Sequence, residues 1–114
     1  KTGRKCPVLL EVHISGEETK QGFDVEEVLE VIKDYRENEY LDIRGMMGMA
    51  PLEADDNRVR ACFNTLASLF EQSKKLEGPA YKAVELSMGM SGDYQIAIEE
   101  GATIVRIGTA LFKE

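Results

Sequence analysis

Short apolar segments alternate with longer amphipathic ones along the whole chain. Four segments are typical of β-strands, because each is a short apolar run that ends near glycine or a polar loop. Between them, apolar residues recur at helical spacing, which predicts helices over about 24–37, 57–76 and 92–100, and a last helical start at the C-terminus. The predicted strands are residues 7–14 (PVLLEVHI), 41–49 (LDIRGMMGM), 83–90 (AVELSMGM) and 103–109 (TIVRIGT).

The first two predicted helices each have one apolar face. Asp24, followed three residues later by Glu27, forms a capping-box pattern at the first helix start. The spacing of the apolar residues places them on one side of each helix, as expected for helices that pack on a sheet. They are Val25, Val28, Leu29, Ile32 and Tyr35 in the first helix, and Val59, Cys62, Phe63, Leu66, Leu69 and Phe70 in the second.

The third predicted helix has clear boundary signals. Ser91 can cap its start, and Asp93 lies in the first turn, where the helix dipole favours negative charge. Gly101 stands where a left-handed residue is wanted at a helix end.

The repeated strand–helix unit predicts an α/β fold with a parallel sheet covered on both faces, because strands this apolar are typical of such sheets. An eight-stranded (β/α)8 barrel of the TIM type needs about 250 residues. About four units in 114 residues therefore predict half of such a barrel, as a single domain over 1–114, with the helices outside. A half barrel has open sheet edges, so we expect a partner, which is either a second copy or the missing half.

Charge and composition exclude several classes of function. The chain has 14 basic and 21 acidic residues and a net charge of -7, which disfavours nucleic-acid binding because such proteins need a basic surface. No apolar stretch approaches the length needed to span a bilayer, so no membrane role is indicated.

The cysteine and histidine content points to a cytoplasmic protein without zinc. The chain has two cysteines, Cys6 and Cys62, no CxxC pattern and one histidine, so we expect two reduced structural thiols and no metal site. No signal peptide precedes the first strand. The chain lacks an initiator methionine and begins almost directly at a strand, which suggests that an upstream segment has been removed.

The last two strand ends have the composition of an anion site. In parallel barrels, functional groups gather in the loops after the strands, and phosphate is favoured after the last two. Gly108 permits close backbone approach, Thr109 offers a hydroxyl and a potential N-cap, and Ser87 and Ser91 bracket the neighbouring strand end. Ordinary strand-to-helix turns with caps are the more common alternative. Arg106 lies in an apolar strand and needs an anionic or hydrogen-bonding partner, since an unpaired buried charge is costly.

Other polar and sulfur-containing residues near strand ends have two interpretations each. His13 either contacts a ligand or is a hydrogen-bonded structural residue, and the latter is more common. Arg44 is expected to pair with Asp42 or Glu11. The methionines either fill gaps in the core, the more common role, or form apolar walls of a ligand mouth. They are Met46, Met47, Met49, Met88 and Met90.

Common catalytic arrangements are missing from the sequence pattern. No Walker loop, G-x-G-x-x-G pattern, Ser-His-Asp triad or spaced carboxylate pair stands out. No predicted strand carries a lysine that could form a Schiff base.

Three segments resemble the pyridoxal phosphate homeostasis protein family, in the order in which that family has them. The run LSMGMSGDYQIAIEEGATIVRIGTALF (86–112) is the specific one, and VHISGEETKQG (12–22) and IRGMMGMAP (43–51) accompany it. The resemblance covers residues 7–112. It implies a barrel similar to that of alanine racemase, with one pyridoxal 5'-phosphate (PLP) at the C-terminal mouth of the strands.

The resemblance also implies roles for individual residues. By position, Ser87, Gly108 and Thr109 would hold the PLP phosphate, and Arg106 would face the pyridine nitrogen. Met88 and His13, which stands where the family usually has asparagine, complete the expected cofactor-binding set. The family's aldimine lysine lies upstream of these residues, so the chain is expected to be the C-terminal half.

The implied function is that of a non-catalytic PLP carrier and regulator of vitamin B6 and amino-acid homeostasis, with no catalytic residue assigned. Two alternatives remain at this point. One is a PLP-dependent racemase or decarboxylase of the same barrel type. The other is a half barrel that acts only as an assembly module.

Overall fold

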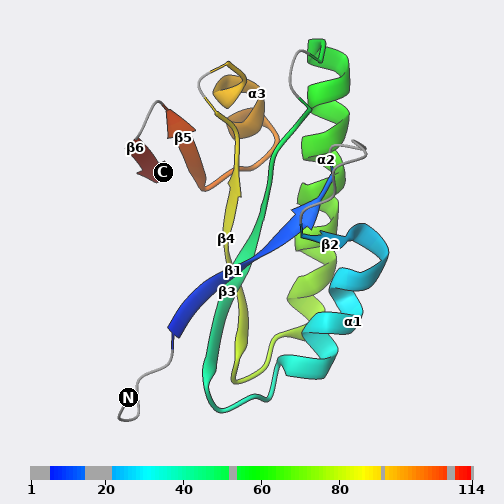
Figure 1. Ribbon diagram of the computed structural model, residues 1–114, viewed down its shortest axis with the longest axis vertical. Helices are drawn as coiled ribbons and strands as arrows, with labels where there is room; N and C mark the ends of the chain where they lie inside the picture. The colour runs from blue at the N-terminus through cyan, green and yellow to red at the C-terminus, as the bar shows by residue number, and fades with distance from the viewer. Residues whose placement is uncertain (1–5, 15–21, 52–53, 91, 108–109, 114) are drawn as a thin grey trace.

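The computed structural model describes residues 6–14, 22–51, 54–90, 92–107 and 110–113 (Figure 1). In chain order its elements are β1 (Cys6–His13), β2 (Phe23–Asp24), α1 (Val25–Tyr35), β3 (Leu41–Gly48), α2 (Asp56–Ser73), the 3-10 turn η1 (Lys74–Leu76), β4 (Tyr81–Met88), α3 (Tyr94–Glu99), β5 (Ile104–Ile107) and β6 (Ala110–Lys113). The four predicted strands and three predicted helices are therefore confirmed, with shifts of a few residues at their ends.

The strands form one sheet in the order β2-β1-β3-β4-β5-β6. The pairs from β2 to β5 are parallel, as predicted. The prediction of a helical start at the C-terminus is wrong, because β6 pairs antiparallel with β5. The edge of β5 offers backbone partners to these residues.

The helices that the structure describes cover one face of the sheet, where both faces were expected to be covered. Figure 1 shows α1 and α2 on the same side of β1, β3 and β4. On this face lie Val12, Met46 and Leu86, each buried to 2% exposure or less. They pack with the predicted apolar residues of α1 and α2, of which Val28, Ile32, Val59, Phe63, Leu66, Leu69 and Phe70 are buried.

The predicted capping box and helix faces are largely confirmed. In α1, the backbone N–H of Asp24 donates to Glu27 Oε1 at 2.9 Å, and the reciprocal bond is also present. Tyr35 is an exception, since its ring is 48% exposed at the end of the helix. In α2, Asp55 is the N-cap and its carboxylate accepts from the backbone N–H of Arg58 at 2.8 Å.

The short helix α3 begins two residues later than predicted. Asp93 is its N-cap residue, and its carboxylate accepts from the backbone N–H of Met90 at 2.7 Å. The predicted cap Ser91 lies outside the described residues. Gly101 follows the helix with φ of +112°, which confirms the left-handed residue expected there. Arg60 of α2 donates to the carboxylates of Glu99 and Glu100, at 2.7 and 2.9 Å, and so ties α3 to α2.

A buried polar pair joins the end of α2 to the start of β4. Ser73 Oγ donates to the carbonyl of Phe70 at 2.6 Å and lies 2.6 Å from the Tyr81 hydroxyl, which therefore donates to it. Both residues have 0% exposure, and burial raises the pKa of Tyr81. The pair lets a tyrosine fill the core without an unsatisfied hydroxyl.

The single cysteine side chain that the structure describes behaves as a structural thiol. Cys62 is free and half-buried on α2, and burial raises the pKa of its thiol, which disfavours the reactive thiolate at neutral pH. Cys6 was also predicted to be a structural thiol, and its side chain lies outside the described residues. Within the described ranges, no helix is both long and apolar enough to cross a membrane.

The strand boundaries also change one prediction about lysine. Because β4 begins at Tyr81, Lys82 is a strand residue, and Lys113 lies in β6. Lys82 is exposed and lies at the opposite end of β4 from Ser87. It is therefore not placed at the end of the sheet where the candidate anion site was expected.

Candidate functional site

One row of side chains crosses the sheet on the face that α1 and α2 leave open. Glu11, Met47 and Ser87 are register partners across β1, β3 and β4, and Ser87 pairs onward with Ile104 of β5. Because alternate residues of a strand share a face, Arg106 lies on the same face, two positions beyond Ile104. The sheet therefore brings Ser87 and Arg106, both predicted from the sequence, to one end of one face.

A shallow hollow lies at this end of the sheet. It is lined by Met47, Gly48, Met49, Ser87, Gly89, Met90 and Arg106, with a volume of about 20 Å³. A larger hollow of about 330 Å³ shares Met49, Gly89 and Met90 with it and extends to the starts of α2 and α3. The larger volume falls in the range of small-molecule sites, about 300–1,000 Å³.

Arg106 is exposed in this structure, so its charge carries no burial cost. Its backbone N–H donates to the carbonyl of Gly89 at 3.0 Å, which links β5 to the loop after β4. No ion pair to its guanidinium is present within the described part of the chain. The guanidinium is thus available for an anionic or hydrogen-bonding ligand. Arg44, by contrast, is paired with Asp42 at 3.0 Å, one of its two expected partners.

Gly89 shapes the loop that borders the hollow. Its φ is +104°, a conformation that other residues rarely adopt. A Cβ atom at this position would lie 2.5 Å from the Cβ of Ala97 in α3. Glycine is therefore required for α3 to pack closely against the loop after β4.

The methionines divide between the two faces. Met46 and Met88 are buried in the core, at 0% and 2% exposure, as the gap-filling interpretation predicts. Met49 and Met90 are exposed at 41% and 38%, and both line the hollow with the half-buried Met47. The Met88 side chain faces the helices, opposite to Ser87, so the structure does not bring it together with the other expected cofactor-binding residues.

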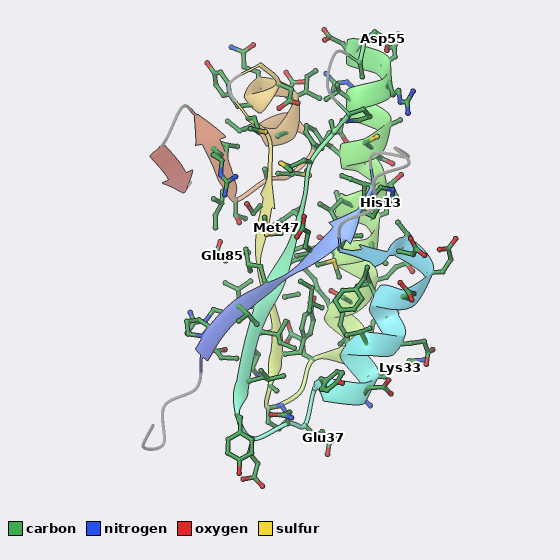
Figure 2. All side chains as sticks on the ribbon, viewed as in Figure 1. His13, Lys33, Glu37, Met47, Asp55 and Glu85 are labelled. Carbon is green, nitrogen blue, oxygen red and sulfur yellow. The ribbon has the colours of Figure 1, made fainter. Side chains whose placement is uncertain are left out.

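His13 lies at the carboxyl end of β1, half-buried, and is not among the residues that line the hollow. Its register partner is Asp24 of β2, on the far side of β1 from Met47 and Ser87. Figure 2 shows His13 at the end of β1. The other two expected phosphate residues, Gly108 and Thr109, lie outside the described residues.

Sequence reasoning did not single out Glu85 and Thr103. The Thr103 hydroxyl donates to Glu85 Oε1 at 2.7 Å, beside the strand pair that carries Ser87 and Arg106. Figure 2 shows Glu85 on the side of β4 that faces away from α1 and α2. An acidic residue within an otherwise apolar strand is the signal that could have indicated this contact.

The described residues contain no group of three or more His, Cys, Asp or Glu side chains that could hold a metal ion. What the open face does offer is a cation, a hydroxyl and thioether side chains beside a glycine loop. Such a surface can hold a flat ligand that carries an anionic group.

The fold is that of a barrel-type α/β protein of about half the usual barrel length, with a hollow at the carboxyl ends of its strands. Residues 1–114 match the family model described as the alanine racemase N-terminal domain, and the chain belongs to this family. This finding confirms the predicted fold class of parallel strands with outer helices.

Curated relatives agree with the resemblance found in the sequence. The chain is 42% identical over 107 residues to the pyridoxal phosphate homeostasis protein of Aquifex aeolicus, covering 94% of this chain and 46% of the relative. It is 38% identical over 113 residues to the protein of the same name in Helicobacter pylori, covering 98% and 48%. The chain spans about half the length of these relatives.

Solved structures are similar in fold. A protein of unknown function from Bifidobacterium adolescentis has a TM-score of 0.85 and 36% identity, over 96% of this chain and 44% of that one. PipY of Synechococcus elongatus, without PLP, has a TM-score of 0.83 and 31% identity, over 94% of this chain and 49% of that one. PipY with PLP bound has a TM-score of 0.74 and 28% identity, over 90% of this chain and 48% of that one.

Proposed function

We propose that the chain, as one domain over 1–114, provides the phosphate and ring-nitrogen side of a PLP site in a non-catalytic protein of PLP and amino-acid homeostasis. The observation that supports this proposal is the presence of Ser87 and the exposed Arg106 in one hollow on the open face. The names of the curated relatives and the PLP bound to PipY point to the same ligand.

The residue types in the hollow fit the two ends of PLP. The hydroxyl of Ser87 suits a phosphate group, because hydroxyls and close backbone N–H groups are its usual partners, and we propose that Gly108 and Thr109, outside the described residues, contribute to the same contact. The thioethers of Met47 and Met90 suit an aromatic ring. PLP itself supplies an electron sink when it is bound.

Arg106 accounts for the absence of catalysis in this proposal. A guanidinium stays charged at all ordinary pH values. Placed beside the pyridine nitrogen, it disfavours protonation of that nitrogen and weakens the ring as an electron sink. A carrier or regulator tolerates this, whereas a racemase would lose rate.

The spectrum of bound PLP tests the role of Arg106. We expect Arg106→Ala to alter the cofactor's absorption, since the charge beside the ring is removed. Arg44→Ala is the matched control, because Arg44 is also an exposed arginine but is paired with Asp42 away from the hollow. Equal spectra for Arg106→Ala and the unchanged protein would contradict a contact between Arg106 and the ring.

Covalent attachment of the cofactor is assigned to a lysine outside this chain. Among the described residues, no lysine lines the hollow, and Lys33, Lys74 and Lys82 lie on α1, on η1 and at the far end of β4. We expect the isolated chain to retain weak affinity for inorganic phosphate but to form no borohydride-reducible adduct with PLP. A stoichiometric adduct measured by intact mass would overturn this assignment.

A PLP-dependent racemase is the second candidate, because the matching family model is described as an alanine racemase domain. Racemisation needs an acid or base across the cofactor. No tyrosine or cysteine lines the hollow within the described residues. Amino-acid racemisation by the longer protein, measured by loss of optical rotation, separates this candidate from the first.

We also propose that the open face and the sheet edges bind a partner, which is either the other half of a barrel or a second copy of this chain. Light scattering of the isolated chain distinguishes the two, since a second copy doubles the mass. A stable monomer would leave only the other half.

A further inference from the structure

The strands that carry Ser87 and Arg106 share very little sheet pairing. β4 and β5 have one parallel register pair, Ser87 with Ile104, whereas β3 and β4 have five. Ladder hydrogen bonds alone therefore do little to hold the two strands in register. The relative positions of Ser87 and Arg106 must depend on other contacts.

Thr103 supplies these contacts from the residue just before β5. Its backbone N–H donates to the carbonyl of Leu86 at 2.8 Å. Its hydroxyl oxygen accepts from the backbone N–H of Leu86, also at 2.8 Å. A single residue thus binds both backbone polar groups of Leu86, the neighbour of Ser87, and clamps the start of β5 to β4.

Glu85 sets the direction of the Thr103 hydroxyl. The hydroxyl has one proton, and the carboxylate oxygen of Glu85 at 2.7 Å is a closer acceptor than the carbonyl of Leu86 at 3.4 Å. A charged acceptor also makes the stronger hydrogen bond. With its proton donated to Glu85, the hydroxyl presents a lone pair to the N–H of Leu86. Glu85 is 8% exposed, so water competes little for this bond.

We propose that Thr103, oriented by Glu85, is a positioning residue that sets Arg106 against Ser87 and so determines how the PLP ring lies relative to its phosphate. This inference rests on the proposed PLP function. Arg106 is three residues after Thr103 on a short strand, and its backbone N–H also donates to the carbonyl of Gly89 in the loop after β4. Loss of the clamp shifts Arg106, while Ser87 stays in its ladder with Met47.

Substitutions at Thr103 separate the hydroxyl from the shape of the side chain. Thr103→Val keeps the branched shape and removes the hydroxyl, and Thr103→Ser restores the hydroxyl. The matched control is Thr65→Val, since Thr65 is an exposed threonine of α2 whose hydroxyl donates to Ala61 at 3.0 Å, away from the site. All variants are made in the full-length protein.

The expected result has two parts. Thr103→Val weakens PLP binding about threefold to tenfold, as loss of one positioning hydrogen bond predicts, and alters the cofactor's absorption in the same direction as Arg106→Ala. Thr103→Ser and Thr65→Val leave both quantities unchanged. The double variant Thr103→Val/Arg106→Ala has the same spectrum as Arg106→Ala alone, because Thr103 acts on the spectrum through Arg106.

Several outcomes would overturn the inference. A folded Thr103→Val protein with unchanged affinity and spectrum contradicts it, as does a spectral change that Thr103→Ser fails to restore. If Thr103→Val does not fold, Glu85→Met is used, because it removes the oxygen that accepts the Thr103 proton and keeps a side chain of similar length. The inference is supported if the absorption of bound PLP changes in the same direction as in Arg106→Ala but by less. An unchanged spectrum contradicts it.

A cofactor-free measurement separates failure of this inference from failure of the proposed function. Hydrogen exchange at the amide of Leu86 should be faster in Thr103→Val than in Thr65→Val without PLP, since its acceptor is removed. Faster exchange with no PLP binding to the unchanged protein would refute the PLP function alone. Unchanged exchange would refute the clamp itself.

Discussion

Neighbouring residues of one strand have different surroundings, because they lie on opposite faces of the central sheet. On β4, Leu86 and Met88 lie on the helix-covered face at 2% exposure, while Ser87 between them is half-buried on the open face. On β3, Met46 is fully buried and its neighbour Met47 lines the hollow. One step along a strand therefore changes a residue's contribution from packing in the core to lining the hollow. The comparison predicts that substitutions on the covered face affect stability, and that those on the open face affect binding.

The largest expected effect is on the covered side. Phe63 of α2 has 0% exposure, so Phe63→Ala leaves a cavity and should lower the free energy of unfolding by about 3–5 kcal/mol. Urea unfolding followed by circular dichroism measures it. Tyr40→Ala is the control, because Tyr40 is 76% exposed. Equal losses for the two variants would break the contrast between covered and exposed positions.

Gly89 lies where the covered side meets the hollow. Gly89→Ala should cost about 1–3 kcal/mol, since the new Cβ meets Ala97 at 2.5 Å and the backbone has φ of +104°. It should also weaken PLP binding, because α3 and the loop after β4 must separate. Gly92→Ala is the control, as a Cβ there meets nothing within 4 Å. Thermal unfolding and PLP titration of both variants give the comparison, which fails if Gly92→Ala is equally harmful.

Tyr81 tests the polar contact within the core. Tyr81→Phe should cost about 1 kcal/mol at neutral pH, because Ser73 loses the hydroxyl that donates to it. Burial raises the pKa of Tyr81, so the folded state retains the phenol proton more strongly than the unfolded state. Stability should therefore fall as the pH rises above the unfolded value of about 10. Urea unfolding between neutral and alkaline pH should show a smaller fall for Tyr81→Phe, and equal slopes would contradict this assignment.

The smallest stability effect is expected on the open face. Ser87→Ala should change the free energy of unfolding by no more than about 0.5 kcal/mol, yet weaken the binding of inorganic phosphate and PLP, since a hydroxyl partner is lost. Ser68→Ala, at an exposed position of α2, is the control for both quantities. Calorimetric titration with phosphate measures the affinity. A stability loss as large as that of Tyr81→Phe would show that the open face also contributes to packing.

Much of the fold follows from local pattern, because apolar period, caps and glycines act within a few residues. The pattern of α2 predicted the buried residues from Val59 to Phe70, and the capping box of α1 formed as expected. Neither edge strand was predicted: β2 was not identified, and the residues of β6 were expected to begin a helix. Each is a short segment without a distinctive pattern, and the neighbouring strand supplies its backbone partners.

The candidate site was predicted in part. The residue types of Ser87 and Arg106 and their strand ends indicated an anion site, whereas Met88, expected beside Ser87, is buried on the opposite face of β4. The contacts of Thr103 with Glu85 and Leu86 span 18 and 17 residues of sequence, so no local pattern encodes them.

The sequence by itself determined the order of the four longer predicted strands and the three helices, the family resemblance and the faces of the helices, because these depend on residue spacing within single elements. Only the tertiary structure decided which strands are neighbours, which face of the sheet stays open and how Thr103 aligns β5 with β4. Those features depend on register between segments that are distant in the chain, where one step moves a side chain to the opposite face.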